Sequence, residues 1–169
     1  MTSSSNPSEV GPQRKHLLSP GPPTHPLSRQ DWLDLEHLVK VEVTSEDALH
    51  PIESALLPGA ESGWRAAQPG EQTIRLIFDQ PQRLTRIWLL FIEPEIPRTQ
   101  EFTLRWSRDA RLFQDIVRQQ WNFNPRGATR ETEDYHVDLS GVIALELTII
   151  PDQSGGDTHA SLAQWRLSR

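Results

Sequence analysis

The chain has 169 residues and carries 17 Lys and Arg against 23 Asp and Glu, which gives a formal net charge of −6. Its length suits one domain with a hydrophobic core, and its negative charge argues against binding to nucleic acids or anionic membranes, which attract positive proteins. Because the sequence contains no cysteine, disulfide bonds, thiolate zinc sites and cysteine nucleophiles are excluded.

The first thirty residues differ in composition from the rest. Residues 1–30 contain six prolines and six serines but only five apolar side chains, too few to offset the entropy of ordering. We expect a disordered tail over residues 1–30 and a folded domain over residues 31–169. No apolar run approaches the roughly 20 residues of a membrane span, and the amino terminus lacks the apolar core of a signal peptide, so a soluble, cytoplasmic protein is expected.

From Asp31 onward apolar and polar residues alternate, which is the period of a β-strand. The pattern is clearest where Phe102, Leu104 and Trp106 alternate with polar neighbours. In all it predicts eight strands, over residues 38–45, 72–79, 84–92, 100–107, 112–121, 132–139, 142–150 and 160–167. In the fifth of these, Ile116 and Val117 break the alternation, so a short helical turn is an alternative there.

No segment has the apolar spacing of a three-turn helix, and we expect an all-β fold, an antiparallel eight-stranded jelly-roll β-sandwich. If successive strands alternate in direction, short connections fall at one end and long connections at the other. The short ones lie at residues 80–83, 108–111 and 140–141, and the long ones at residues 46–71, 93–99, 122–131 and 151–159. Long loops gathered on one rim of a rigid scaffold suit ligand binding; the alternative is tolerated insertions without function.

Several short motifs follow one another along the chain. They are Gly59, Gly63-Trp64-Arg65, Gln72 to Asp79, Leu84 to Phe91, Phe102 to Asp109, Phe113 to Val117, Tyr135 to Pro151 and Ala160 to Leu167. Together they resemble the discoidin, or coagulation factor 5/8 type C, family over residues 38–168. The resemblance implies a galactose-binding domain-like jelly roll that takes ligands through loops at one end.

Two positions depart from the family pattern. Pro58 and Gln164 stand where many carbohydrate-binding relatives have the Asp and Glu of a structural calcium site, so we expect no calcium and no other cofactor. The segment Gly63 to Ile74 also resembles the amino-terminal domain of an X-ray-repair scaffold protein, which shares this jelly roll and works as an interaction module. A protein-binding scaffold is therefore the alternative to a sugar-binding module.

The loop after the fifth predicted strand has the densest cluster of candidate binding residues. Asn122, Asn124, Arg126 and Arg130 surround Phe123. Two amides, two guanidinium groups and a ring suit a neutral polyol, whose hydroxyls need both donors and acceptors. The alternative is a loop in which Asn and Gly form turns and Phe123 fills the core.

Three further candidates lie in or beside the long loops. Arg65 can make bidentate hydrogen bonds to hydroxyls, a carboxylate or a phosphate, or else a salt bridge within the protein. His50 and His159 offer a donor and an acceptor to a sugar on the predicted rim, although solvated histidines are the ordinary interpretation. Trp64 is interpreted as a core residue rather than a sugar platform. No residue spacing supports a metal site.

These observations favour a non-catalytic module that binds carbohydrate through its rim loops. The alternative is protein–protein interaction through the same rim or through a sheet face bearing Arg75, Arg86 and Arg105, which carboxylates such as Asp79 and Glu101 are expected to neutralise. No nucleotide-binding glycine loop, serine elbow or recognisable catalytic carboxylate pair is present, and we expect no enzymatic activity.

Overall fold

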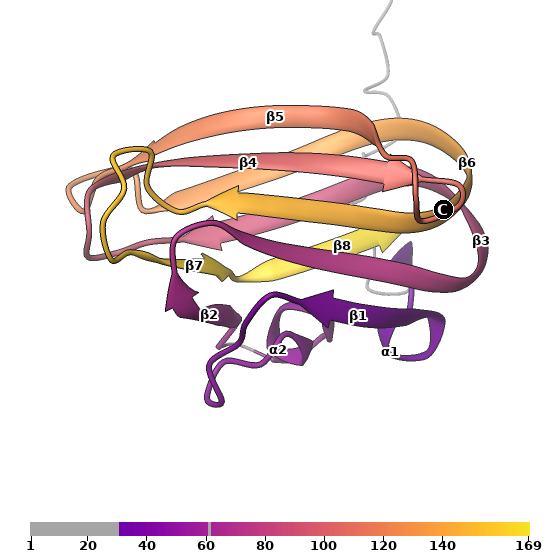
Figure 1. The fold of residues 1–169 in the computed structure, drawn as a ribbon, viewed down its shortest axis with the longest axis horizontal. Helices are drawn as coiled ribbons and strands as arrows, with labels where there is room; N and C mark the ends of the chain where they lie inside the picture. The colour runs from indigo at the N-terminus through magenta and orange to yellow at the C-terminus, as the bar shows by residue number, and fades with distance from the viewer. Residues whose placement is uncertain (1–30, 61) are drawn as a thin grey trace, which may run out of the picture.

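The computed structural model describes residues 31–60 and 62–169; the tail predicted over residues 1–30 lies outside the described residues. The described chain has eight strands and two four-residue helices (Figure 1). They are α1 (Leu35–Leu38), β1 (Val39–Val43), α2 (Glu53–Leu56), β2 (Trp64–Pro69), β3 (Gln72–Ile92), β4 (Arg98–Ser107), β5 (Gln114–Phe123), β6 (Arg130–Ile150), β7 (His159–Leu162) and β8 (Gln164–Ser168). Neither helix is long enough to cross a membrane.

Two long strands, β3 and β6, build both layers of the fold. They pair antiparallel with each other from Gln72↔Ile149 to Ile92↔Arg130. The first half of β3 and the second half of β6 lie in a five-stranded layer of order β1-β3-β6-β4-β5. Their other halves form a three-stranded layer with β8. The result is a β-sandwich, to which β2 and β7 add a two-stranded ribbon (Figure 1).

Both long strands bend from one layer to the other at the same end of the molecule, on the right in Figure 1. The register between β3 and β6 shifts between Ile77 and Arg86, and such irregularities bend a strand. In β6 the bend includes Gly141, whose φ of 70° is a conformation that glycine adopts without steric cost.

These bends correct the predicted strand boundaries. The predicted strands 72–79 and 84–92 are one strand, as are 132–139 and 142–150. The short connections expected at residues 80–83 and 140–141 are therefore bends inside strands, because β3 and β6 remain paired across them.

The remaining differences between the predicted and the observed strands have local causes. The predicted strand 112–121 is β5, and Ile116 is the extra residue of a β-bulge opposite Leu104 and Arg105, so alternation breaks without a helical turn. The predicted strand 160–167 is divided at Ala163 into β7 and β8. The predicted loop 46–71 contains α2 and also β2, which alternates only over its first few residues.

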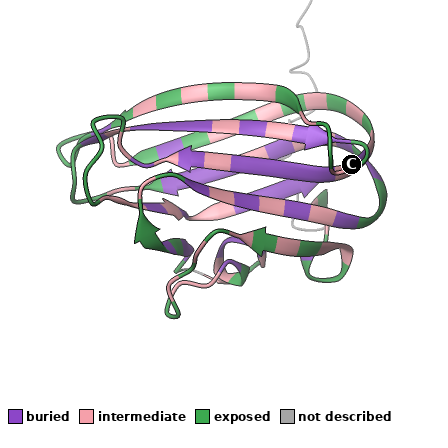
Figure 2. Ribbon diagram, in the orientation of Figure 1, coloured by how far each residue is buried: buried purple, intermediate pink, exposed green. Residues whose placement is uncertain are grey.

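Inward-facing side chains of both layers form one core. Ile74 in the first half of β3 and Leu89 in the second half are both fully buried. The rings of Phe91 and Phe102 stack with their centroids 5.1 Å apart. Figure 2 shows buried residues alternating with partly or fully exposed ones along the strands. Burial of this alternating apolar set supplies the main driving force for the fold.

The long connections meet at the end opposite the bends, on the left in Figure 1, which we call the loop end. It comprises residues 44–52, 93–97, 124–129 and 151–158. Backbone hydrogen bonds hold three of these segments in place: the Glu93 N–H donates to the Thr129 carbonyl at 2.8 Å, and the Gln153 N–H donates to the carbonyl of Thr99 in β4 at 2.7 Å. Three of the predicted long loops and the first part of the fourth, residues 46–71, gather at one end as expected, whereas the later part of that fourth loop forms α2 and β2.

Candidate functional site

A hollow of about 380 Å³, here called the rim hollow, lies where three segments of the loop end meet. Its lining includes His50, Arg65 and His159, together with residues 92–96 and 157–158. The structure thus brings together three of the candidate residues predicted from the sequence.

The β2–β7 ribbon places Arg65 on the rim hollow. Arg65 pairs with Ser161 across the ribbon, and its neighbours Trp64 and Ala66 are buried, so the alternation of the strand turns Arg65 outward. Its backbone N–H donates to the His50 carbonyl at 3.1 Å. Within residues 31–60 and 62–169 the guanidinium has no hydrogen-bond or ion-pair partner, although its charge contributes to the lowered pKa of Asp47, so its N–H donors remain for a ligand.

The two histidines of the rim hollow are held differently. His159 Nδ1 lies 2.9 Å from the Ala66 carbonyl oxygen. Because a carbonyl oxygen only accepts, Nδ1 carries the hydrogen and Nε2 is the acceptor of the neutral ring. His50 Nδ1 lies 3.6 Å from Asp47 Oδ1, beyond hydrogen-bond distance. His159 therefore offers a ligand an acceptor on a ring that is fixed in place.

Two isoleucines give the rim hollow an apolar wall. Ile92 and Ile96 are 38% and 48% exposed. Trp64 does not present its ring, because it is 1% exposed and its indole N–H donates to the Ser45 carbonyl at 3.2 Å. The interpretation of Trp64 as a core residue is confirmed. A sugar bound here would place its C–H face against aliphatic side chains.

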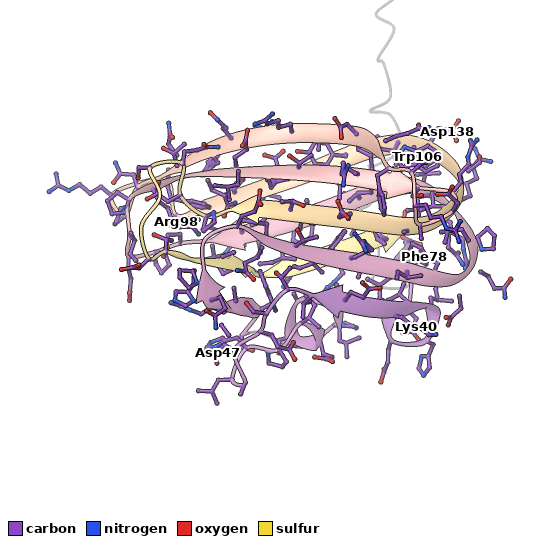
Figure 3. The ribbon with its side chains drawn as sticks, in the orientation of Figure 1. Lys40, Asp47, Phe78, Arg98, Trp106 and Asp138 are labelled. Atoms are coloured by element: carbon purple, nitrogen blue, oxygen red, sulfur yellow. The ribbon has the colours of Figure 1, made fainter. Side chains whose placement is uncertain are left out.

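Arg98, which sequence reasoning did not identify, is a buried residue that connects segments of the loop end through its side-chain hydrogen bonds (Figure 3). Its side chain is 1% exposed. Nε donates to Glu93 at 3.0 Å, and Nη1 donates to the Gln100 side chain at 3.0 Å and to the Pro151 carbonyl at 2.6 Å. The guanidinium lies 4.8 Å from the ring centroid of Phe123. One cation therefore ties the segment 93–97 to the start of the segment 151–158.

A buried carboxyl group, Glu131, extends this network. Its Oε2 accepts from the Gln100 amide at 3.3 Å, and its Oε1 has no hydrogen-bond partner in the described part of the chain. Burial raises the pKa of Glu131 to about 8, and the neighbouring carboxylate of Glu133 contributes to this rise. At neutral pH the folded protein therefore keeps a proton on Glu131.

This proton makes stability depend on pH. The unfolded chain releases it near the ordinary glutamate pKa of 4.5, whereas the folded protein holds it to about pH 8. The free energy of unfolding is expected to fall as the pH rises through this window, by at most about 1.4 kcal/mol per pH unit, and to level off above it. Glu131→Gln mimics the neutral form and should gain stability relative to wild type as the pH rises, which urea unfolding at several pH values measures.

Glu95→Gln, at an exposed position of the same rim, is the matched control and should keep the wild-type slope. If the stability difference between Glu131→Gln and wild type stayed constant from pH 5 to pH 8.5, the retained proton would not be on Glu131.

The other four predicted site residues lie elsewhere on the loop end. Asn122 lines a second hollow. Asn124 forms a turn, since its Oδ1 accepts from the Arg126 N–H at 3.0 Å. Arg126 and Arg130 are exposed and line neither hollow, and Phe123 is buried. The loop predicted as the densest cluster is therefore divided between a turn, the core and the second hollow.

The arginines on the sheet faces are neutralised within the protein. Arg75 and Arg105 both donate to the buried carboxylate of Glu146, which lies between them. Arg86 lies on the three-stranded layer and binds Asp134 with two hydrogen bonds of 2.7 Å. These paired guanidinium groups do not form a shared anion-binding groove.

Whether this chain could bind calcium, as many carbohydrate-binding relatives do, depends on the groups around Pro58 and Gln164. Pro58 and Gln164 line one hollow together with Arg166. Nη1 of Arg166 donates to the Ala55 carbonyl at 2.7 Å, and Nη2 donates to the Leu57 carbonyl at 3.2 Å. The guanidinium takes the carbonyl oxygens that a calcium ion would need. The residues present do not fit calcium.

A second group of potential metal ligands lies at the start of α1. Asp34, Glu36 and His37 have ligand atoms within 4.8 Å of one another, and all three are exposed. Asp34 accepts from the Glu36 N–H at 3.2 Å and contacts His37 Nδ1 at 2.7 Å. The carboxylate therefore caps α1, which explains the cluster without a metal.

Comparison with known proteins identifies the fold. No family model and no curated protein matches the sequence. Among solved structures, CBM32-3 from a family 31 glycoside hydrolase of Clostridium perfringens is similar at a TM-score of 0.61 and 18% identity, covering 82% of this chain and 95% of that chain. The family 32 module of C. perfringens NanJ, in complex with galactose, gives 0.58 and 14% identity, with 78% and 93% covered.

A third similar structure is the CBM32 of AlyQ in complex with 4,5-unsaturated mannuronic acid, with a TM-score of 0.58 and 14% identity over 77% of this chain and 94% of that chain. These structures confirm the predicted galactose-binding domain-like β-sandwich and the discoidin-type resemblance at the level of fold. A fold of this kind does not by itself fix the ligand, which has to be argued from the site.

Proposed function

We propose that this chain is a non-catalytic carbohydrate-binding module that holds a neutral sugar in the rim hollow. The observation that carries the proposal is the meeting of Arg65, His159 and Ile96 on one hollow at the loop end. A sugar needs hydrogen-bond donors, acceptors and an apolar surface for its C–H face. These three side chains provide one of each.

The charges of the rim hollow favour a neutral ligand. The solved neighbours include one complex with galactose and one with an unsaturated mannuronic acid, so ligand charge has to be decided by the lining of this chain. Glu93 is paired with Arg98, but Glu95 and Asp157 still outnumber the single guanidinium of Arg65 among the described lining residues. An anionic sugar would meet this excess of negative charge, whereas a neutral hexose would not.

No catalytic role is proposed for these carboxylates. Glu93 is bound by Arg98 at 3.0 Å, an ion pair that occupies the carboxylate. Several of the similar structures are binding modules, one of them from a glycoside hydrolase. A module that attaches to a sugar without cleaving it agrees with both observations.

Binding is tested by calorimetry with galactose and an array of neutral mono- and oligosaccharides. Arg65→Ala is expected to weaken binding by about 10- to 100-fold, because it removes about 1.5–3 kcal/mol of charge-assisted hydrogen bonding. Galacturonate is expected to bind less tightly than galactose. Melting temperatures of the variants show whether any loss reflects unfolding.

Two further variants make this test discriminating. Arg111→Ala, an exposed arginine at the opposite end of the sandwich, should leave the affinity unchanged. Arg126→Ala tests whether the sugar binds at the loop of residues 122–131 instead of the rim hollow. If this variant lost binding and Arg65→Ala kept it, the site would lie on that loop. A wild-type protein that binds no sugar of the array would refute the proposal.

A further inference from the structure

A second hollow lies on the other side of the segment 93–97. Its volume is about 600 Å³, and we call it the amide hollow because its lining includes Thr99, Gln120, Asn122, Gln153 and Ser154. Residues of the same two segments line the two hollows, although no described residue lines both. Ile96 lines the rim hollow and the next residue, Pro97, lines the amide hollow, while the segment 151–158 contributes to both.

A buried carboxylate orients one of the amides. Glu101 accepts from Gln153 Nε2 at 2.8 Å and is also bound by Arg118. The pKa of Glu101 is lowered, mainly by the hydrogen bond from Arg118, with further hydrogen bonds from Gln153 and Gln120. Since a carboxylate only accepts, Gln153 turns its NH₂ group toward it. The carbonyl oxygen of Gln153 is then the end that remains for a ligand.

Asn122 is oriented in the opposite sense. Its Oδ1 accepts from the Thr99 hydroxyl at 2.8 Å, so its NH₂ group is the end that remains as a donor. The Gln153 N–H donates to the Thr99 carbonyl at 2.7 Å, which holds the segment 151–158 against β4. The amide hollow therefore presents one donor, from Asn122, and one acceptor, from Gln153, whose orientation is set before any ligand arrives.

The amide hollow has no cation to offer an anionic ligand among its described lining residues. Arg98 reaches it, but its side chain is 1% exposed and is bound to Glu93, Gln100 and the Pro151 carbonyl. Asp152 adds a carboxylate to the lining. Fixed donors and acceptors without a free positive charge suit the hydroxyls of a neutral polyol and disfavour phosphates and uronates.

We infer that the amide hollow is a second subsite for a neutral saccharide unit, so that the loop end holds two units at once. This inference rests on the proposed function of the rim hollow. Two linked subsites would raise the avidity for an oligosaccharide above that for a single sugar, because the second unit binds at a high effective concentration.

Two-dimensional ¹H–¹⁵N NMR of the full chain during a galactose titration tests the subsite, because side-chain NH₂ groups of Asn and Gln give their own signals. We expect two groups of shifts with separate binding curves. One comprises the backbone signals of Arg65 and His159, and the other comprises the side-chain amides of Asn122 and Gln153. Asn122→Ala should weaken the second binding curve by about tenfold or more and leave the first unchanged.

Asn124→Ala, which removes an exposed amide from the neighbouring turn, is the matched control and should preserve both groups of shifts. Shifts at Arg65 and His159 without a response at Asn122 and Gln153 would overturn the second subsite and leave the proposed function standing. No shift anywhere would overturn the proposed function itself. A stronger response of Asn122 to galacturonate than to galactose would overturn the assignment to neutral saccharides.

Discussion

Replacing Arg98 by methionine is expected to lower the free energy of unfolding by about 3–5 kcal/mol, the usual cost of removing one partner of a buried ion pair. The substitution leaves Glu93 without its cation and the Pro151 carbonyl and Gln100 without their donor. Methionine fills a similar volume, so the loss measures the polar network rather than a cavity. Urea unfolding provides the measurement.

The same variant is expected to lose sugar binding, because the segments 93–97 and 151–158 are no longer tied together. Arg108→Met is the matched control. Arg108 is exposed at the opposite end, where it lies over the ring of Trp106 and donates to the Ser140 carbonyl, and its loss should be much smaller. Equal losses from the two variants would show that the Arg98 network contributes little.

Replacing Arg166 by methionine is expected to cost about 3 kcal/mol, because the buried carbonyls of Ala55 and Leu57 lose hydrogen bonds from a charged donor. Arg166 is buried, and this burial lowers the pKa of its guanidinium. It also joins α2 to β8, so the variant should release the segment around α2. Chemical unfolding and hydrogen exchange at residues 53–57 measure the two effects.

Because Arg166 binds the Ala55 and Leu57 carbonyl oxygens, we expect that calcium does not stabilise the protein. The melting temperature of the wild type is expected to be the same with calcium and with a chelator. Arg169→Met, which removes an exposed arginine bound to Gln82 at the same end of β8, should lose much less stability than Arg166→Met. A rise of several degrees with calcium in the wild type would show that the residues around Arg166 do bind calcium.

The fold class could be predicted because burial follows the alternation of the sequence. Phe102, Leu104 and Trp106, which alternate most clearly, are all buried on β4. The strand boundaries could not be predicted where a strand bends between layers, since the turn residue Gly141 looks the same in a bend and in a hairpin. The strand β2 was missed because its second half is exposed and ends in Pro69.

The site could be predicted only in part. His50, Arg65 and His159 were predicted on loops that share one end, and the structure does bring them together there, although Arg65 lies on β2 and His159 begins β7. Arg98 could not be identified, because its role depends on contacts with Glu93 and Pro151 that no sequence spacing reveals.

The carboxylate that pairs with the sheet arginines also could not be predicted from the sequence. Asp79 and Glu101 were expected to neutralise them, but the register places Glu146 directly opposite both Arg75 and Arg105. A cross-strand neighbour of this kind is set by pairing between strands far apart in sequence.

A crystal structure of the chain soaked with galactose would show where the sugar binds. We expect sugar density in the rim hollow, with a hydroxyl bonded to the Arg65 guanidinium, another to His159 Nε2, and the C–H face against Ile96. Density confined to the outer face around Arg75 and Arg105, or to the turn at Asn124 and Arg126, would contradict this expectation.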